Sequence, residues 1–192
     1  FDISSENFEK ITVTVNNGWL KINPTSEIDE NITLNTTNVV NVYDGKTYTA
    51  ETASATDKNG GEVTIEYSAD GGKTWTTDPT TIKATNVDDS VTVQVRASGA
   101  NYTGYVTGTQ KLTITKRAVT LTSETATKPY DGTALTRPTV AVSGDGFVTG
   151  EVSGITATGS VTYVTDGPNH DGVVENTIEY TKNYSFVEDN YT

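Results

Sequence analysis

The stretch KLTITKRAVTLTS, residues 111–123, decides the fold class of this chain. Apolar and polar side chains alternate along most of it, and it contains neither Gly nor Pro. Alternation with a period of two is the pattern of a half-buried β-strand. Because a flexible linker would be rich in Gly and Ser or irregular and polar, we predict that one strand runs here directly into the next and forms a short, stiff joint.

The same alternation recurs along the whole chain, separated by turn-forming residues, and no segment shows a convincing helical period. Residues 50–57 are compatible with at most one short helix. Val outnumbers Leu 21 to 5, and Thr is the commonest residue, so β-branched side chains dominate. The sequence therefore predicts an all-β fold with two packed sheets per unit. The expected strands cover residues 11–15, 63–67, 91–97, 112–115, 140–142, 161–164 and 178–180.

Composition limits what the chain can do. It carries a net charge of −12, which disfavours binding to nucleic acid because little is available to neutralise phosphates. It has no cysteine, which excludes disulfides and thiolate metal sites. No apolar run reaches the length of a membrane span. Val, Ile, Leu and Phe make up 40 of the 192 residues, so we expect a thin core.

Two short motifs reveal an internal repeat. Tyr43-Asp44-Gly45 returns 87 residues later (43 to 130) as Tyr130-Asp131-Gly132. Asn101-Tyr102-Thr103 returns 89 residues later (101 to 190) as Asn190-Tyr191-Thr192. A fixed spacing of this size predicts two copies of one module.

The ends of the chain do not coincide with the ends of this repeat. We expect residues 1–31 to be the closing strands of a preceding repeat plus a linker, and residues 32–117 to be the first full β module. Residues 118–192 are then a second β module that lacks its last strand, because the alternating segment 108–115 has no counterpart after Thr192. Structural units permuted relative to this period are the alternative.

With these motifs, the module resembles the Ig-like and MBG-type repeats that form long arrays on Gram-positive surface proteins. The matching elements are the Tyr-Asp-Gly box, the Asn-Tyr-Thr box and the closing run Leu-Thr-Ile-Thr-Lys-Arg at 112–117. The resemblance implies tandem Ig-like β-sandwich modules, with β-grasp-like modules as the alternative. It also implies an extracellular protein, wall-attached or secreted, in which the modules form the stalk of an adhesin.

Residues 68–75, Ser-Ala-Asp-Gly-Gly-Lys-Thr-Trp, match the Asp-box pattern known from sialidases and other β-propellers. In this pattern the Asp caps backbone amides in a tight turn, the Gly supplies a positive φ, and the Trp packs over the hairpin. We interpret the segment as a structural hairpin. The residues that define it are Ser68, Asp70, Gly72, Thr74 and Trp75.

The Tyr-Asp-Gly motifs are interpreted as turns whose tyrosine packs and hydrogen-bonds through its hydroxyl. Exposed aromatic side chains stack against sugars, so Trp19 and Trp75 are the candidate ligand contacts. His170 is the only histidine, and without a second imidazole or a thiolate it does not indicate a transition-metal site. The carboxylates beside it lack the spacing of an EF-hand loop.

No nucleophile–base pair is recognisable in the sequence, so we expect no catalytic residue, no metal and no cofactor. The leading interpretation is a non-catalytic stalk or spacer module whose partners are neighbouring repeats of the same chain. The alternatives are a module that binds a host glycan or host protein, and an accessory module of a secreted glycosidase.

Overall fold

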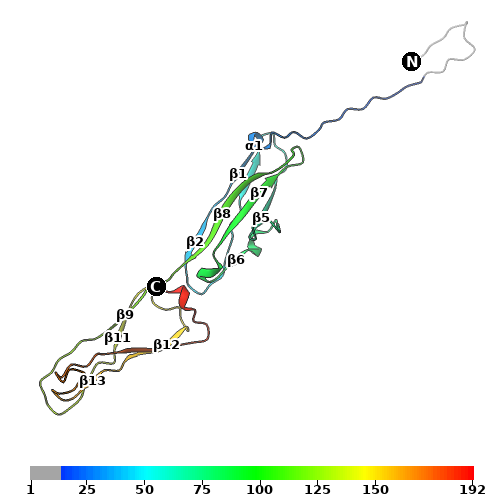
Figure 1. Ribbon diagram of the computed structural model, residues 1–192. Coiled ribbons are helices and arrows are strands. Elements are labelled where there is room, and N and C mark those ends of the chain that lie inside the picture. The colour runs from blue at the N-terminus through cyan, green and yellow to red at the C-terminus, as the bar shows by residue number, and fades with distance from the viewer. Residues whose placement is uncertain (1–13) are drawn as a thin grey trace, which may run out of the picture.

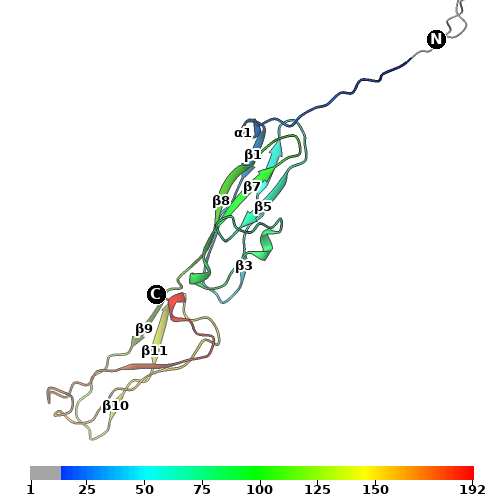
Figure 2. The same ribbon diagram turned by 45° about the vertical axis from the view of Figure 1, so that its right-hand side comes forward.

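The computed structural model describes residues 14–192 and shows a chain built of β-strands with very little helix. Two elongated lobes follow one another end to end in both views, and the C-terminus lies at their boundary (Figures 1 and 2). We call residues 28–115 the first lobe and residues 119–192 the second lobe. The prediction of an all-β fold is confirmed.

The first lobe contains one short helix, two 3-10 turns and eight strands. Helix α1 covers Ile28–Asn31, and the turns η1 and η2 cover Pro79–Thr81 and Val87–Asp89. The strands are β1 (Ile32–Asn35), β2 (Val39–Val42), β3 (Tyr48–Thr49), β4 (Ser54–Asp57), β5 (Thr64–Ser68), β6 (Lys83–Ala84), β7 (Val91–Ser98) and β8 (Val106–Thr115).

A four-stranded sheet in the order β2-β8-β7-β5 forms the largest element of the first lobe. Strand β8 lies at its centre, antiparallel to β7 and parallel to β2. Along β7 every second side chain from Val93 onward is buried, as the alternation in the sequence predicts. Two smaller antiparallel pairs, β1–β4 and β3–β6, complete the lobe.

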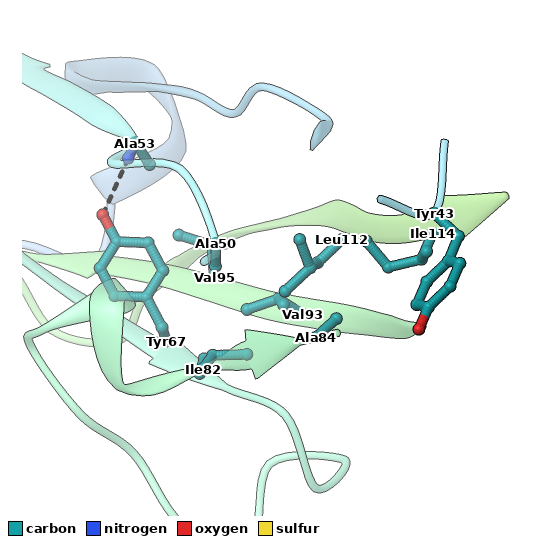
Figure 3. Packing of buried hydrophobic residues seen from close by; sticks show 10 residues of the cluster. All are labelled: Tyr43, Ala50, Ala53, Tyr67, Ile82, Ala84, Val93, Val95, Leu112 and Ile114. Carbon is teal, nitrogen blue, oxygen red and sulfur yellow. Dashed lines mark hydrogen bonds between the residues drawn. The ribbon is translucent and has the colours of Figure 1, made fainter. Parts of the chain in front are cut away.

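The core of the first lobe forms where β8 meets β7 and the β3–β6 pair. Leu112 of β8 is fully buried, and Ile114 is 2% exposed. Around them pack Tyr43, Ala84 and other small or β-branched side chains (Figure 3). Tyr67 is buried with its hydroxyl, which accepts a hydrogen bond from Ala53 N at 2.8 Å. The hydroxyl is therefore satisfied inside the core, as a buried polar group must be.

The second lobe has six strands and one 3-10 turn, η3 (Glu188–Asn190). Its pairs are β9–β11, β10–β13 and β12–β14, all antiparallel. These repeat the first-lobe pairs β1–β4, β3–β6 and β5–β7 in the same chain order. The strands are β9 (Val119–Ser123), β10 (Leu135–Thr136), β11 (Val140–Gly144), β12 (Val152–Ala157), β13 (Ser160–Val161) and β14 (Ile178–Lys182).

Several details differ from the sequence prediction. Residues 50–57 form no helix, because they lead into strand β4, and the only α-helix of the described chain is α1. The strand expected at 161–164 stops at Val161, because Asp166 accepts the N–H groups of Thr162 and Tyr163 and closes a turn. The strand expected at 11–15 lies mostly outside the described residues, and residues 14 and 15 belong to no strand.

Strands β8 and β9 do not fuse into one. Residues 116–118 separate them, and Arg117 forms an isolated parallel bridge to Tyr191. The joint is therefore a short break in the strand that is held by contacts from the end of the chain.

Candidate functional site at the boundary of the two lobes

The two tryptophans singled out in the sequence have different surroundings. Trp19 is 80% exposed in a segment, residues 14–24, that contains no strand. Trp75 is half-buried, and its Nε1 donates to Gly72 O at 3.0 Å. The guanidinium of Arg96 lies 3.9 Å from the centre of its ring and 4.2 Å from that of Tyr105. One face of Trp75 is thus occupied by a cation–π contact.

The hairpin at 68–75 is organised around the carboxylate of Asp70. Its Oδ1 accepts Lys73 N at 2.9 Å and Thr74 N at 3.0 Å, and its Oδ2 accepts the Thr74 hydroxyl at 2.6 Å. The Ser68 hydroxyl also donates to Oδ1, at 2.8 Å. These hydrogen bonds hold the pKa of Asp70 well below its usual range, and those from Thr74 contribute most to the shift. The geometry is that of a self-contained turn.

The two Tyr-Asp-Gly motifs form the same turn. Asp44 accepts the N–H of Lys46 at 3.0 Å, and Asp131 accepts the N–H of Thr133 at 2.9 Å. The glycine of each motif, at 45 and at 132, has φ of 77°, which an L side chain adopts only at a cost. The sequence repeat is therefore a repeat of local backbone structure.

The tyrosines of these motifs have different surroundings. Tyr43 is 3% exposed, whereas Tyr130 is 63% exposed. The hydroxyl of Tyr43 reaches across the boundary between the lobes and donates to Glu151 Oε1 at 2.5 Å. Its ring meets that of Tyr191 edge-on, with centroids 5.6 Å apart.

Glu151 connects the lobes through its two carboxylate oxygens. While Oε1 accepts Tyr43, Oε2 accepts the hydroxyl of Tyr191 at 2.5 Å. The residue is only 4% exposed. A buried carboxylate is costly unless donors surround it, so the two tyrosines are required partners and not incidental neighbours.

Burial affects the ionisation of both tyrosines. Burial, followed by the hydrogen bond to Glu151, raises the pKa of Tyr43 to about 12. The same two causes raise the pKa of Tyr191 further. Both hydroxyls therefore keep their protons, and remain donors to Glu151, throughout the neutral range.

Asn190 is the second link across the boundary and is fully buried. Its Oδ1 accepts the N–H of Val87 at 2.8 Å, and its Nδ2 donates to Asn86 Oδ1 at 2.8 Å. Val87 is the first residue of the turn η2 of the first lobe, and Asn86 is its N-cap. The amide oxygen and the amide nitrogen of Asn190 thus bond to two adjacent residues, and this fixes both the orientation and the position of the side chain.

Arg117 completes the boundary from the segment between β8 and β9. Its guanidinium donates to three carbonyl oxygens, those of Tyr43, Asp145 and Gly146. Its own backbone N–H donates to Asn190 O at 2.8 Å, and its carbonyl accepts Thr192 N at 3.0 Å. One residue therefore ties together both lobes and the end of the chain.

A related arrangement lies at the opposite end of the first lobe. The hydroxyl of Tyr102 donates to Asp57 Oδ1 at 2.8 Å, as that of Tyr191 donates to Glu151. Thr103 N donates to Thr25 O at 2.8 Å, matching the bond from Thr192 to Arg117. Asn101, the counterpart of Asn190, is exposed there.

Sequence reasoning found part of this boundary. It singled out Tyr43, Tyr191 and Asn190 through the two repeated motifs, but it missed Glu151 and the role of Arg117. Glu151 lies in no motif, and only its burial marks it. Arg117 sits in the joint that the alternation indicated, so its position, although not its role, could be read from the sequence.

His170 lies in an exposed turn with φ of 56°. Between residues 14 and 192, no three or more His, Asp or Glu side chains come together as metal ligands would. No helix in that part of the chain is long and apolar enough to cross a membrane.

Comparison with models of protein families, with curated proteins and with solved structures gives no match for this chain.

Proposed function

We propose that this chain is a non-catalytic piece of a tandem array of β modules that serves as a stalk or spacer of a bacterial surface adhesin. The observation that carries the proposal is the boundary between the lobes, where Glu151 and Asn190 are buried and hydrogen-bonded to the other lobe. Each lobe is one module, with the Ig-like β-sandwich as the favoured class and a β-grasp-like module as the alternative. The location that fits is extracellular, wall-attached or secreted.

The contacts at the boundary favour a fixed angle between the modules. A hydrophobic contact tolerates sliding, whereas a hydrogen bond weakens steeply when its angle changes. Here the linking bonds come from three different places: the Tyr43 ring, the η2 turn and the break at Arg117. Because three separate segments make these contacts, a rotation of one lobe about any one of them would strain the others. A stalk needs this property.

The arrangement at the far end of the first lobe supports an array longer than two modules. Asn101 and Tyr102 are the motif counterparts of Asn190 and Tyr191, and Asp57 accepts the hydroxyl of Tyr102 as Glu151 accepts that of Tyr191. The exposed Asn101 is available to a preceding module in the way that Asn190 is used by η2. The partners that fit are neighbouring repeats of the same kind.

Small-angle X-ray scattering of the chain tests this proposal. We expect a narrow distribution of shapes with the two lobes end to end. The variant Asn190→Ala removes the bonds to Asn86 and Val87 and should broaden that distribution, whereas Asn101→Ala, at the opposite end of the first lobe, should leave it unchanged. A wild-type chain that samples a broad range of angles between the lobes would refute a stiff stalk.

Binding of a host glycan or host protein is the second candidate, and the exposure of Trp19 favours it. A large exposed aromatic side chain is a suitable platform for a sugar ring. Trp75 is less suitable, because Arg96 covers one of its faces. Glycan-array binding that disappears in Trp19→Ala, and persists in Trp75→Ala, would support this function over that of a passive spacer.

A further inference from the structure

The four-stranded sheet of the first lobe has two edges that are finished in different ways. At the β5 edge, the hairpin at 68–75 brings Thr76 back beside Tyr67, and the two residues exchange hydrogen bonds of 2.8 and 2.9 Å. At the other edge lies β2, which pairs with β8 and with no other strand within residues 14–192 (Figure 1). Every strand of this lobe, from β1 to β8, lies inside the described chain, so the open β2 edge belongs to the module itself.

The backbone groups that face this open edge are those of Val40 and Val42. On the opposite side of β2, Tyr43 N donates to Thr115 O at 2.9 Å, and Asn41 O accepts the Thr115 hydroxyl at 3.2 Å. Because successive residues of a strand point their backbone groups to opposite edges, the N–H and C=O groups of Val40 and Val42 point away from β8. Their side chains are 61% and 46% exposed. The edge therefore offers donors, acceptors and apolar side chains to an added strand.

The sequence leaves this edge unprotected in the first module and blocks it in the second. Natural proteins protect an exposed edge with Lys, Pro or a bulge. Residues 31–43 contain no charged residue and no Pro. In the second module, Lys128 and Pro129 stand 87 residues after Asn41 and Val42 (41 to 128 and 42 to 129). The proline takes the position whose N–H faces the open edge, so it removes a donor that an added strand needs.

The β2 edge is complementary to a second copy of itself. A twofold axis at Asn41 places Val40 of one copy opposite Val42 of the other, and such a pair exchanges both of its N–H···O bonds. The symmetry repeats this pair, so the outward donors and acceptors of both copies are all used. Beyond it, Asn38 comes opposite Asp44, and no like charges meet. No partner other than this chain is needed to satisfy the edge.

We propose that β2 is a self-association edge, through which two copies of the chain form a dimer by antiparallel β2–β2 pairing. The two four-stranded sheets then become one continuous sheet. The valines of the two strands form cross-strand pairs beside Thr113 and Thr115, which lie in register with Val40 and Val42 on β8. The pairing does not depend on the stalk function proposed above, but in an array of stalks it joins chains that run in opposite directions.

Sedimentation equilibrium of the wild-type chain, at concentrations between about 10 µM and about 1 mM, measures the association. A contact made by one edge strand is small, so we expect a weak, reversible dimer in equilibrium with the 20.5 kDa monomer. Each copy carries a net charge of −12, so added NaCl should strengthen the dimer by screening the repulsion.

Amide hydrogen exchange locates the contact. The N–H groups of Val40 and Val42 should exchange more slowly as the protein concentration rises. The N–H of Tyr43, which is bonded to β8, should exchange at the same rate at every concentration.

Three variants test the geometry of the pairing. Val42→Pro copies the second module and should abolish the dimer without loss of a bond to β8. Val42→Thr keeps both the N–H and the β-branched shape and should retain it. Val40→Lys places a charge on the exposed edge and should weaken association about tenfold or more. If Val42→Pro fails to fold, Val40→Lys and the exchange of the wild-type amides still decide the question.

The proposal is overturned if the wild-type chain stays monomeric at about 1 mM in high salt, where association is strongest. It is also overturned if Val42→Pro dimerises as the wild type does, or if the amides slowed by concentration lie outside β2. Neither Glu151 nor Asn190 belongs to β2, so such a failure would leave the proposed stalk function intact.

Discussion

The two lobes share the order of their strand pairs but differ sharply in what they bury. All but one of the buried hydrophobic residues of the described chain lie between residues 28 and 114, and the exception is Ala157. The second lobe instead buries two polar residues, Glu151 and Asn190, where it meets the first. The same pattern of strand pairs is therefore accompanied by a hydrophobic core in the first lobe and by almost none in the second.

This difference separates the local contacts that form the strand pairs from the contacts that form the core. Turns and local pairs, such as those at Asp44 and Asp131, set the pattern of strands in both lobes. The core of the first lobe is built from side chains of β5, β7 and β8 that pack against the β3–β6 pair. In the second lobe the buried polar residues Glu151 and Asn190 lie at the contact with the first lobe.

The largest expected effect is a difference between the two lobes in the cost of removing a leucine side chain. Leu112→Ala removes a fully buried side chain and should lower the free energy of unfolding of the first lobe by about 2–5 kcal/mol. The matched change Leu121→Ala, in the second lobe, should cost about 1 kcal/mol or less, because Leu121 is only partly buried. Amide hydrogen exchange resolved by residue measures both. Equal losses would contradict the difference in core.

High pH should act on the boundary before it acts on the core. An unfolded tyrosine titrates near pH 10, whereas burial and Glu151 raise the pKa of Tyr43 to about 12. Below pH 10 both states are protonated and the stabilisation is complete, and as pH rises towards 12 it is lost. The loss is on the order of 3 kcal/mol, because each of the two pKa units corresponds to about 1.4 kcal/mol.

Tyrosine absorbance and exchange at η2, followed between pH 9 and pH 12, measure this loss. The variant Tyr43→Phe removes one titrating group and should flatten the pH profile of the boundary. A profile that is the same in Tyr43→Phe and in the wild type would show that Tyr43 does not control the contact.

Removal of the shared acceptor should loosen the second lobe more than the first. Glu151→Ala leaves the hydroxyls of Tyr43 and Tyr191 without their acceptor and should destabilise the second lobe by about 1–2 kcal/mol. Glu175→Ala, an exposed carboxylate in the same lobe, is the matched control and should have little effect. If the two variants unfold alike, the boundary does not stabilise the second lobe.

The smallest effect should be the same in both lobes. Asp44→Ala and Asp131→Ala each remove the acceptor of one backbone N–H in an equivalent turn. Each should cost about 0.5–1 kcal/mol locally, seen as faster amide exchange at Lys46 and at Thr133. A marked effect in one turn only would show that the repeated motif does not play the same role twice.

The sequence predicted what depends on neighbours along the chain. Alternating side chains predicted β7 and the end of β8, and the repeated motifs predicted two equivalent turns around Gly45 and Gly132. The all-β class follows from the same local preferences. The pairs β3–β6 and β10–β13 were not predicted, because two-residue strands carry no periodicity that could reveal them.

The boundary was predicted only in part, because its chemistry comes from residues distant in sequence. Tyr43 and Glu151 are 108 residues apart, and no spacing or motif connects a lone glutamate to a tyrosine at that separation. The asparagine of the Asn-Tyr-Thr motif shows the same limit. It is buried at 190 and exposed at 101, and only the presence of a neighbouring lobe distinguishes the two.

The central claim is that the two lobes are held at one angle by the contacts of Glu151, Asn190 and Arg117. The chain contains no cysteine, so spin labels can be attached at Thr33→Cys and Thr122→Cys, two exposed strand positions in different lobes. Double electron–electron resonance then measures the distance between the labels. The account predicts one narrow distance distribution that becomes broad in Asn190→Ala. A broad distribution in the chain with native Asn190 would contradict it.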